Sequence, residues 1–246
     1  MRNRLSFFVS AVLLALACST PTTPSAAPSS TTTTTTTTGA APAWYSKFSS
    51  AVTVSIDGSN VRLRSTGVPD HTSPYWGVGN ALYEAPHAGM QLNPNRISTQ
   101  SLVLRVPSAP TAATPSDTPM GPMGIAVNGV ALFNQYAAGR SPLTNEILTF
   151  DRFNGHPQQT GQYHYHLEPL WLTARDGEAA LIGVLLDGYP VYGPRESGGA
   201  LPSGLDTCNG HTHTTTDFPS GSYHYHVTTS VPYISGCFSG RPGSIG

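Results

Sequence analysis

The chain has 246 residues, of which only 10% are charged, and its formal net charge is −1. A nearly neutral chain without a basic stripe argues against nucleic acid as a partner. The portion after residue 43 has roughly 200 residues, enough for one domain with a substantial core.

The N-terminus has the features of an export signal. Arg2 and Arg4 precede an apolar run over 5–17, which is too short for a membrane-spanning helix. The run ends in Leu-Ala-Cys at Cys18, which resembles the lipobox of bacterial lipoproteins, where the cysteine is acylated. We therefore expect 1–18 to be a lipoprotein signal peptide and Cys18 the lipidation site. The alternative is an ordinary signal peptide with an incidental cysteine.

The next segment, 19–43, is made of Thr, Pro, Ser, Ala and Gly, with eight consecutive threonines over 31–38. It has no charge and no large apolar side chain, so it cannot bury enough surface to fold. We expect a disordered tether that joins the lipid anchor to one folded domain over 44–246. The protein would then be extracytoplasmic, attached to the cell envelope through its lipid alone.

Short β-branched and apolar segments, separated by Gly and Pro, predict an all-β domain with long loops. We expect helical turns near 44–49 and 134–138. Strands are expected at 51–56, 61–63, 101–106 and 146–150.

Two segments predict matching β-hairpins, because 124–133 aligns with 183–192 at an offset of 59 residues. Each has an Asn-Gly or Asp-Gly pair between apolar runs, a signal for a hairpin with a type I′ turn. The duplication continues into a pattern D-x-x-N-G-H followed by G-x-Y-H-Y-H. We expect a single domain with two pseudo-symmetric repeats, about 120–170 and about 180–237, whose two Y-H-Y-H strands lie side by side.

Seven of the nine histidines fall in these repeats. A strand presents residues i and i+2 on one face, so two such strands can direct four imidazoles to one point. The predicted ligands are His164, His166, His224 and His226, with His156 and His211 bordering the same cavity. The metal is expected to be copper or zinc, which suit imidazole ligands. The alternative is a Tyr–His ladder that only stabilises the sheet, with Tyr163, Tyr165, Tyr223 and Tyr225 on the opposite face.

The aspartates of the D-x-x-N-G-H loops, Asp151 and Asp206, have two possible roles. Each could accept the second N–H of a ligating imidazole and so orient it. Each could instead cap the turn of its own loop. The sequence leaves both roles open.

The cysteines other than Cys18 are Cys208 and Cys237. An even number in an oxidising compartment predicts a disulfide. The alternative, Cys208 as a thiolate ligand, would break the symmetry, because Phe153 occupies the matching position of the first repeat.

These motifs together resemble the bacterial YHYH-domain family. The resemblance runs from Gly-Val-Pro-Asp-His at 67–71 to Pro-Tyr-Ile-Ser-Gly-Cys at 232–237 and includes both Y-H-Y-H strands. It implies a secreted or envelope-attached protein and makes metal binding the expected property. Three function classes follow from the sequence: an envelope metal-binding protein, an extracytoplasmic metalloenzyme of hydrolytic or oxidative type, and a surface carbohydrate-binding or adhesion module.

Overall fold

A computed structural model describes residues 39–246, which belong to the second of two compact units, Thr36–Gly246. The predicted signal peptide, Cys18 and the tether as far as residue 38 lie outside the described residues. Strands dominate this part, joined by short 3-10 helices and a single α-helix, so the all-β prediction is confirmed. None of the helices within 39–246 has the length and apolarity needed to cross a membrane.

The largest sheet has eight strands in the order β13-β14-β12-β11-β5-β6-β10-β9. Its strands are β13 (Gly210–His213), β14 (Ser222–His226), β12 (Pro190–Tyr192), β11 (Leu181–Leu185), β5 (Gly124–Ala126), β6 (Ala131–Leu132), β10 (Tyr163–Tyr165) and β9 (Gly155–Pro157).

The two halves of this sheet have the same succession of pairings outward from the central antiparallel pair β5–β11. In each half an antiparallel hairpin, β5–β6 or β11–β12, comes first. The hairpin's outer strand pairs in parallel with a Y-H-Y-H strand, β10 or β14. That strand then pairs antiparallel with the edge strand that begins with the Gly-His pair of the D-x-x-N-G-H pattern, β9 or β13.

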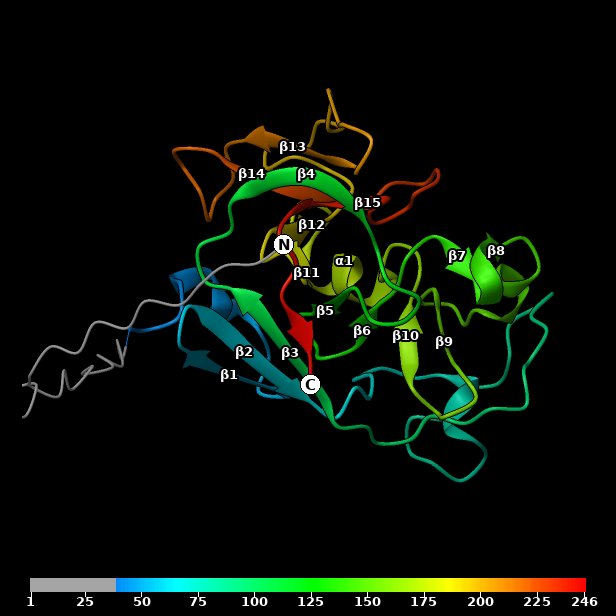
Figure 1. The fold of residues 1–246 in the computed structure, drawn as a ribbon. Helices are drawn as coiled ribbons and strands as arrows, with labels where there is room; N and C mark the ends of the chain where they lie inside the picture. Colours follow the sequence, from blue (N-terminus) through cyan, green and yellow to red (C-terminus); the bar gives the residue numbers. More distant parts are fainter. Residues whose placement is uncertain (1–38) are drawn as a thin grey trace, which may run out of the picture. The chain divides into compact units, whose positions relative to one another are not determined.

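The Y-H-Y-H strands are therefore not side by side, and that prediction is wrong. Four strands separate β10 from β14, and Figure 1 shows them toward opposite ends of the sheet. Neighbouring strands are about 4.8 Å apart, so five steps place the two strands roughly 24 Å apart. One ion cannot bridge that distance with metal–nitrogen bonds of about 2.0–2.1 Å.

A smaller sheet has the order β1-β2-β3-β16 and shares one hydrophobic core with the larger sheet. Val61, Leu63 and Leu104 of this sheet are fully buried in the same cluster as Ile125 and Val184 of the eight-stranded sheet. The elements outside the large sheet are, in chain order, η1 (Ala43–Lys47), β1 (Val52–Asp57), β2 (Asn60–Ser65), η2 (Pro74–Trp76), β3 (Leu102–Pro107), β4 (Ala112–Asp117), β7 (Tyr136–Ala137), η3 (Ala138–Arg140), β8 (Ser141–Pro142), η4 (Glu146–Thr149), α1 (Leu170–Asp176), β15 (Cys237–Gly240) and β16 (Ser244–Ile245).

Most expected elements are present, and two are wrong. The strands expected at 51–56, 61–63 and 101–106 are β1, β2 and β3, and the turn expected near 44–49 is η1. The segment 146–150 is not a strand but the 3-10 helix η4, which places Glu146 and Thr149 on one side of a turn. The segment 134–138 contains strand β7 at Tyr136–Ala137, and the helical turn starts only at Ala138.

Both hairpins form, but their turns are not of type I′. That turn requires positive φ at both central residues. Only the glycines have positive φ, 89° at Gly129 and 86° at Gly188, and neither Asn128 nor Asp187 does. The side chain of Asn128 instead reaches the phenol oxygen of Tyr165 at 3.2 Å, which ties the turn to the neighbouring strand.

Candidate metal centres

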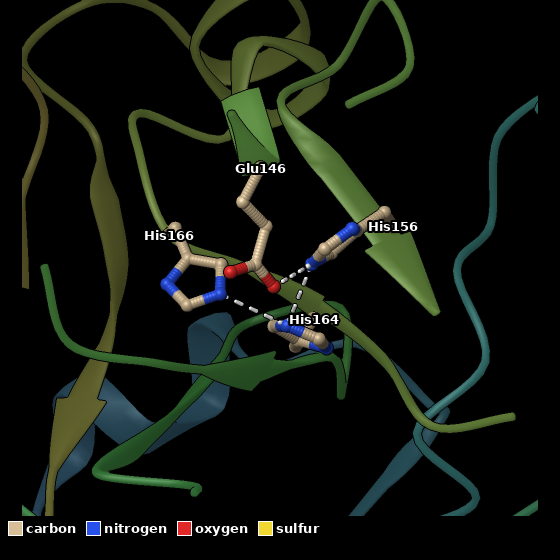
Figure 2. A group of neighbouring side chains, drawn as sticks. All are labelled: Glu146, His156, His164 and His166. Carbon is tan, nitrogen blue, oxygen red and sulfur yellow. Dashed lines mark hydrogen bonds and ion pairs between the residues drawn. The ribbon is translucent and has the colours of Figure 1, made fainter. Parts of the chain in front are cut away.

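The first group of possible metal ligands is built on the β9–β10 hairpin (Figure 2). His156 lies directly opposite His164 in the register, and His166 follows two residues later on the same face. The Nε2 atom of His164 is 3.1 Å from that of His156 and 3.0 Å from that of His166. Glu146, from helix η4, completes the group with its Oε1 atom 3.3 Å from His156 Nε2.

The second group repeats this construction on the β13–β14 hairpin. His211 lies opposite His224, and the Nε2 atoms of His224 and His226 are 3.1 Å apart. Glu196, from the loop after β12, places its Oε1 atom 3.1 Å from His211 Nε2 and 3.6 Å from His226 Nε2. In each group the four ligand atoms lie within 4.8 Å of one another.

Backbone carbonyls fix the orientation of most of these rings. His164 and His166 direct Nδ1 to the carbonyl oxygens of Gln162 and Asn134, at 3.1 and 2.6 Å. In the second group the Nδ1 atoms of three histidines each bind a backbone carbonyl: His211 to Ser203, His224 to Ser222 and His226 to Gly193. A carbonyl oxygen can only accept, so each of these Nδ1 atoms carries the proton.

His156 reaches the same tautomer through a hydroxyl group. Its Nδ1 atom is 2.7 Å from the hydroxyl oxygen of Thr149, whose own proton goes to the carbonyl of Glu146. The hydroxyl therefore accepts from His156 Nδ1. In all six rings Nδ1 therefore carries a proton, so Nε2 is the nitrogen that can bind a metal ion, and these Nε2 atoms converge within each group.

Convergent lone pairs repel one another unless a cation or a proton lies between them. Burial lowers the pKa of His164 well below its ordinary value and lowers the pKa of His166 to about 4. Burial likewise lowers the pKa of His224 to about 4 and lowers that of His226. At neutral pH these four rings are therefore unprotonated on Nε2.

The second group also contains a buried acceptor without a donor. His211 Nε2 is buried and makes no hydrogen bond, although a carboxylate oxygen of Glu196 is 3.1 Å away. Either a proton on His211 Nε2 or a cation bound between the two atoms satisfies both of them. In the first group a side-chain hydrogen bond with His156 lowers the pKa of Glu146, so this carboxylate is anionic.

The six predicted histidines are thus brought together as two groups of three rather than one group of six. Sequence reasoning missed both glutamates. Glu146 lies 10 residues before His156 and Glu196 lies 15 residues before His211, so no fixed spacing marks them. The available signal was weak: one acidic residue upstream of each D-x-x-N-G-H loop.

The aspartates cap their loops, and neither contacts a ligand imidazole. Asp151 accepts from the backbone N–H groups of Phe153 and Gly155, at 3.0 and 3.3 Å, and from the Tyr163 hydroxyl at 2.7 Å. Asp206 makes the same three bonds, to Cys208, Gly210 and Tyr223. The orienting role considered for them belongs instead to backbone carbonyls in five of the six rings and to the Thr149 hydroxyl in His156, because those are the groups that the Nδ1 atoms reach.

The four tyrosines of the Y-H-Y-H strands point away from the histidines, as the strand alternation predicts. Tyr163, Tyr165 and Tyr225 are fully buried. Tyr165 binds His71, and Tyr225 binds Asp187 and the backbone N–H of Ser239. Packing and hydrogen bonding account for these side chains.

The predicted disulfide is confirmed: Cys208 and Cys237 are bonded across a sequence separation of 29. Cys208 is therefore not a thiolate ligand. The bridge joins the loop before β13 to strand β15, next to the second group.

Fold and geometry define the class: a mainly β protein with two histidine–glutamate groups that could each hold a metal ion. The family described as YHYH protein matches this chain over residues 103–201 and 196–240, more than half of its length. The chain therefore belongs to the YHYH protein family, and the resemblance seen in its motifs is confirmed. All eight residues of the two groups lie in the matched range. No curated protein and no solved structure matches the chain.

Proposed function

We propose that the protein binds two transition-metal ions, zinc or copper, one in each histidine–glutamate group. The observation that carries this proposal is the convergence of three histidine Nε2 atoms and one carboxylate oxygen in each group. A divalent cation bound between these atoms would be coordinated by all four of them and would balance the charge of the carboxylate.

The donor set supports a four-coordinate ion. Four ligands at 2.0–2.1 Å in a tetrahedron lie about 3.3 Å from one another. The ligand atoms already stand at 3.0–3.1 Å between histidines and at 3.1–3.3 Å between His and Glu in the closest pairs. Three imidazoles with one carboxylate suit zinc and copper, the metals expected from the histidines alone.

Binding is favoured over the two other function classes. Four protein donors close a tetrahedral shell, whereas catalytic zinc sites keep one position open for water or substrate. The adhesion class depended on exposed tyrosines, and three of the four Y-H-Y-H tyrosines are fully buried. We therefore place the protein among metal-binding proteins that store or buffer an ion.

The test is the metal stoichiometry of tag-free protein, measured by calorimetry and elemental analysis with zinc and with Cu(II). Two equivalents are expected per chain. His164→Ala should remove one equivalent, His224→Ala the other, and the double variant both. His87→Ala is the matched control, because His87 lies outside both groups.

The outcomes separate cleanly. Absence of saturable binding to the intact, folded protein would refute the proposal. A single equivalent that survives either histidine substitution would also contradict it, because each group should hold its own ion.

We also propose that the protein is an envelope lipoprotein acylated at Cys18. The support is the Leu-Ala-Cys ending of the apolar N-terminal run and the uncharged threonine-rich segment after it. The disulfide agrees with an oxidising, extracytoplasmic location. Labelled palmitate should enter the wild-type protein and not Cys18→Ala. Equal labelling of the two would refute acylation at this residue.

A further inference from the structure

The two groups differ at a position just outside them. His211 and His156 occupy matching places on the edge strands, and two residues later stand His213 in β13 and Gln158 after β9. The two positions correspond because their partners do. His213 pairs with Ser222, and the Gln158 N–H donates to the carbonyl of Gln162. Ser222 and Gln162 each lie two residues before the first histidine of their Y-H-Y-H strand.

His213 contacts the carboxylate of the second group from the solvent side. Its Nδ1 atom is 3.2 Å from Glu196 Oε2, while Oε1 of the same carboxylate is 3.1 Å from His211 Nε2. The ring stacks on His211 with centroids 5.5 Å apart, and 53% of the His213 side chain is exposed. Glu196 thus links a buried ligand set to an imidazole at the surface.

In the first group the side chain of Gln158 makes its hydrogen bonds to residues other than Glu146. Its side-chain amide binds Gln162 and Thr160, at 2.9 and 3.2 Å. Glu146 is the more exposed of the two glutamates, 28% against 12% for Glu196, so exposure of the carboxylate alone does not distinguish the groups. The feature that distinguishes the second group is the surface imidazole of His213 beside its carboxylate.

The first group is also held more firmly by aromatic rings. Phe133 stacks on His164 with centroids 3.9 Å apart, and Phe150 stacks on His166 at an interplanar angle of 7°. The residue before the loop aspartate is Leu205 in the second repeat, in place of Phe150, and Tyr192 meets His224 only edge-on. Glu196 also lies on the wall of a cavity of about 800 Å³, which gives this carboxylate a second approach from outside.

We propose that the second group is the exchange site of the protein and that His213 is the residue through which metal enters and leaves it. This rests on the proposed metal binding. A metal ion leaves a closed ligand set stepwise, and each lost bond is easier to break when a nearby ligand replaces it. His213 can replace His211 at the ion while Glu196 stays bound, because both imidazoles contact that carboxylate. The first group lacks such a ligand and retains its ion.

The experiment is transfer of zinc from the loaded full-length protein to an excess of a chromophoric chelator, followed by stopped-flow absorbance. The wild-type protein should release zinc in two phases. His213→Gln, which installs the residue of the first group, should slow only the fast phase, roughly tenfold for the loss of one polar contact to a charged group. The reciprocal Gln158→His should accelerate only the slow phase. Both positions are exposed, so both variants should fold.

Each result bears on the proposal. Release in one phase, or a fast phase unchanged by His213→Gln, would overturn it while leaving metal binding intact. A His213→Gln variant that loses one zinc at equilibrium would make His213 a permanent ligand and would also overturn it. Failure of the wild-type protein to load any zinc would refute the metal-binding proposal itself, which calorimetry detects separately.

Discussion

At the residue scale, the D-x-x-N-G-H loops show which residue type each position requires. Asn154 and Asn209, not the glycines after them, adopt the left-handed conformation, with φ of 65° and 71°. Asparagine tolerates this region better than most residues. The glycine is required for another reason: a Cβ atom at Gly155 would overlap the hydroxyl of Tyr163, which passes close to reach Asp151.

The loop aspartates give the first prediction. Asp151 is buried and accepts three hydrogen bonds, so Asp151→Ala should lower the free energy of unfolding by about 2–4 kcal/mol, because the Tyr163 hydroxyl loses its buried partner. Asp206→Ala should cost less, since Asp206 is exposed. Urea unfolding measures both.

Metal stoichiometry provides the control for these variants. Both should still bind two equivalents, because neither aspartate contacts an imidazole. A folded Asp151→Ala protein that has lost an ion would show that the carboxylate supports the site after all.

At the element scale, the two hairpins β9–β10 and β13–β14 each deliver three histidines, and a separate loop or turn delivers the glutamate. The turn η4 presents Glu146 and the hydroxyl of Thr149 together, and the loop after β12 presents Glu196. The second hairpin differs from the first because the disulfide between Cys208 and Cys237 links the loop before β13 to strand β15.

The second prediction concerns this bridge. Replacing both Cys208 and Cys237 with Ser should lower the free energy of unfolding by about 3.6 kcal/mol, the chain-entropy value for a loop of this length. Cys208 lies three residues before His211, so metal affinity should weaken in the second group and not in the first. Calorimetry on the single-site variants His164→Ala and His224→Ala, each with and without the bridge, compares the groups. Equal weakening of both would contradict a local role.

At the scale of the whole molecule, the buried histidines link stability to pH. The pKa of His166 and of His224 is lowered to about 4, against about 6.5 for a free histidine. The unfolded chain therefore binds more protons than the folded chain in this range. The free energy of unfolding of the metal-free protein should fall as pH decreases from about 6.5 to about 4. One shift of this size corresponds to a loss on the order of 3 kcal/mol.

This third prediction is checked by urea unfolding at several pH values between 7.5 and 4 in the presence of a chelator. His224→Gln should have a shallower dependence than the wild-type protein, whereas His87→Ala should follow it. Constant stability over this range would contradict the burial of neutral imidazoles. Added zinc should steepen the profile, because ligation requires the same unprotonated rings.

Local sequence patterns determined much of this protein. The two hairpins follow from Asn-Gly and Asp-Gly between apolar runs, and the division of the Y-H-Y-H side chains into a histidine face and a tyrosine face follows from the two-residue period of a strand. Both depend on residues a few positions apart, so no tertiary information is needed. The disulfide followed from having one pair of cysteines in a domain predicted to be exported.

Only the tertiary structure decided how many sites these residues form. The order of strands depends on pairing between distant segments, and the parallel pairings β6–β10 and β12–β14 place each Y-H-Y-H strand outside its own hairpin. The central pair β5–β11 then keeps the two histidine sets apart. The sequence did not indicate the roles of the glutamates or of His213, because their contacts join distant segments. The spacing from each glutamate to its histidines differs between the repeats, so only the folded structure shows which carboxylate contacts which imidazoles.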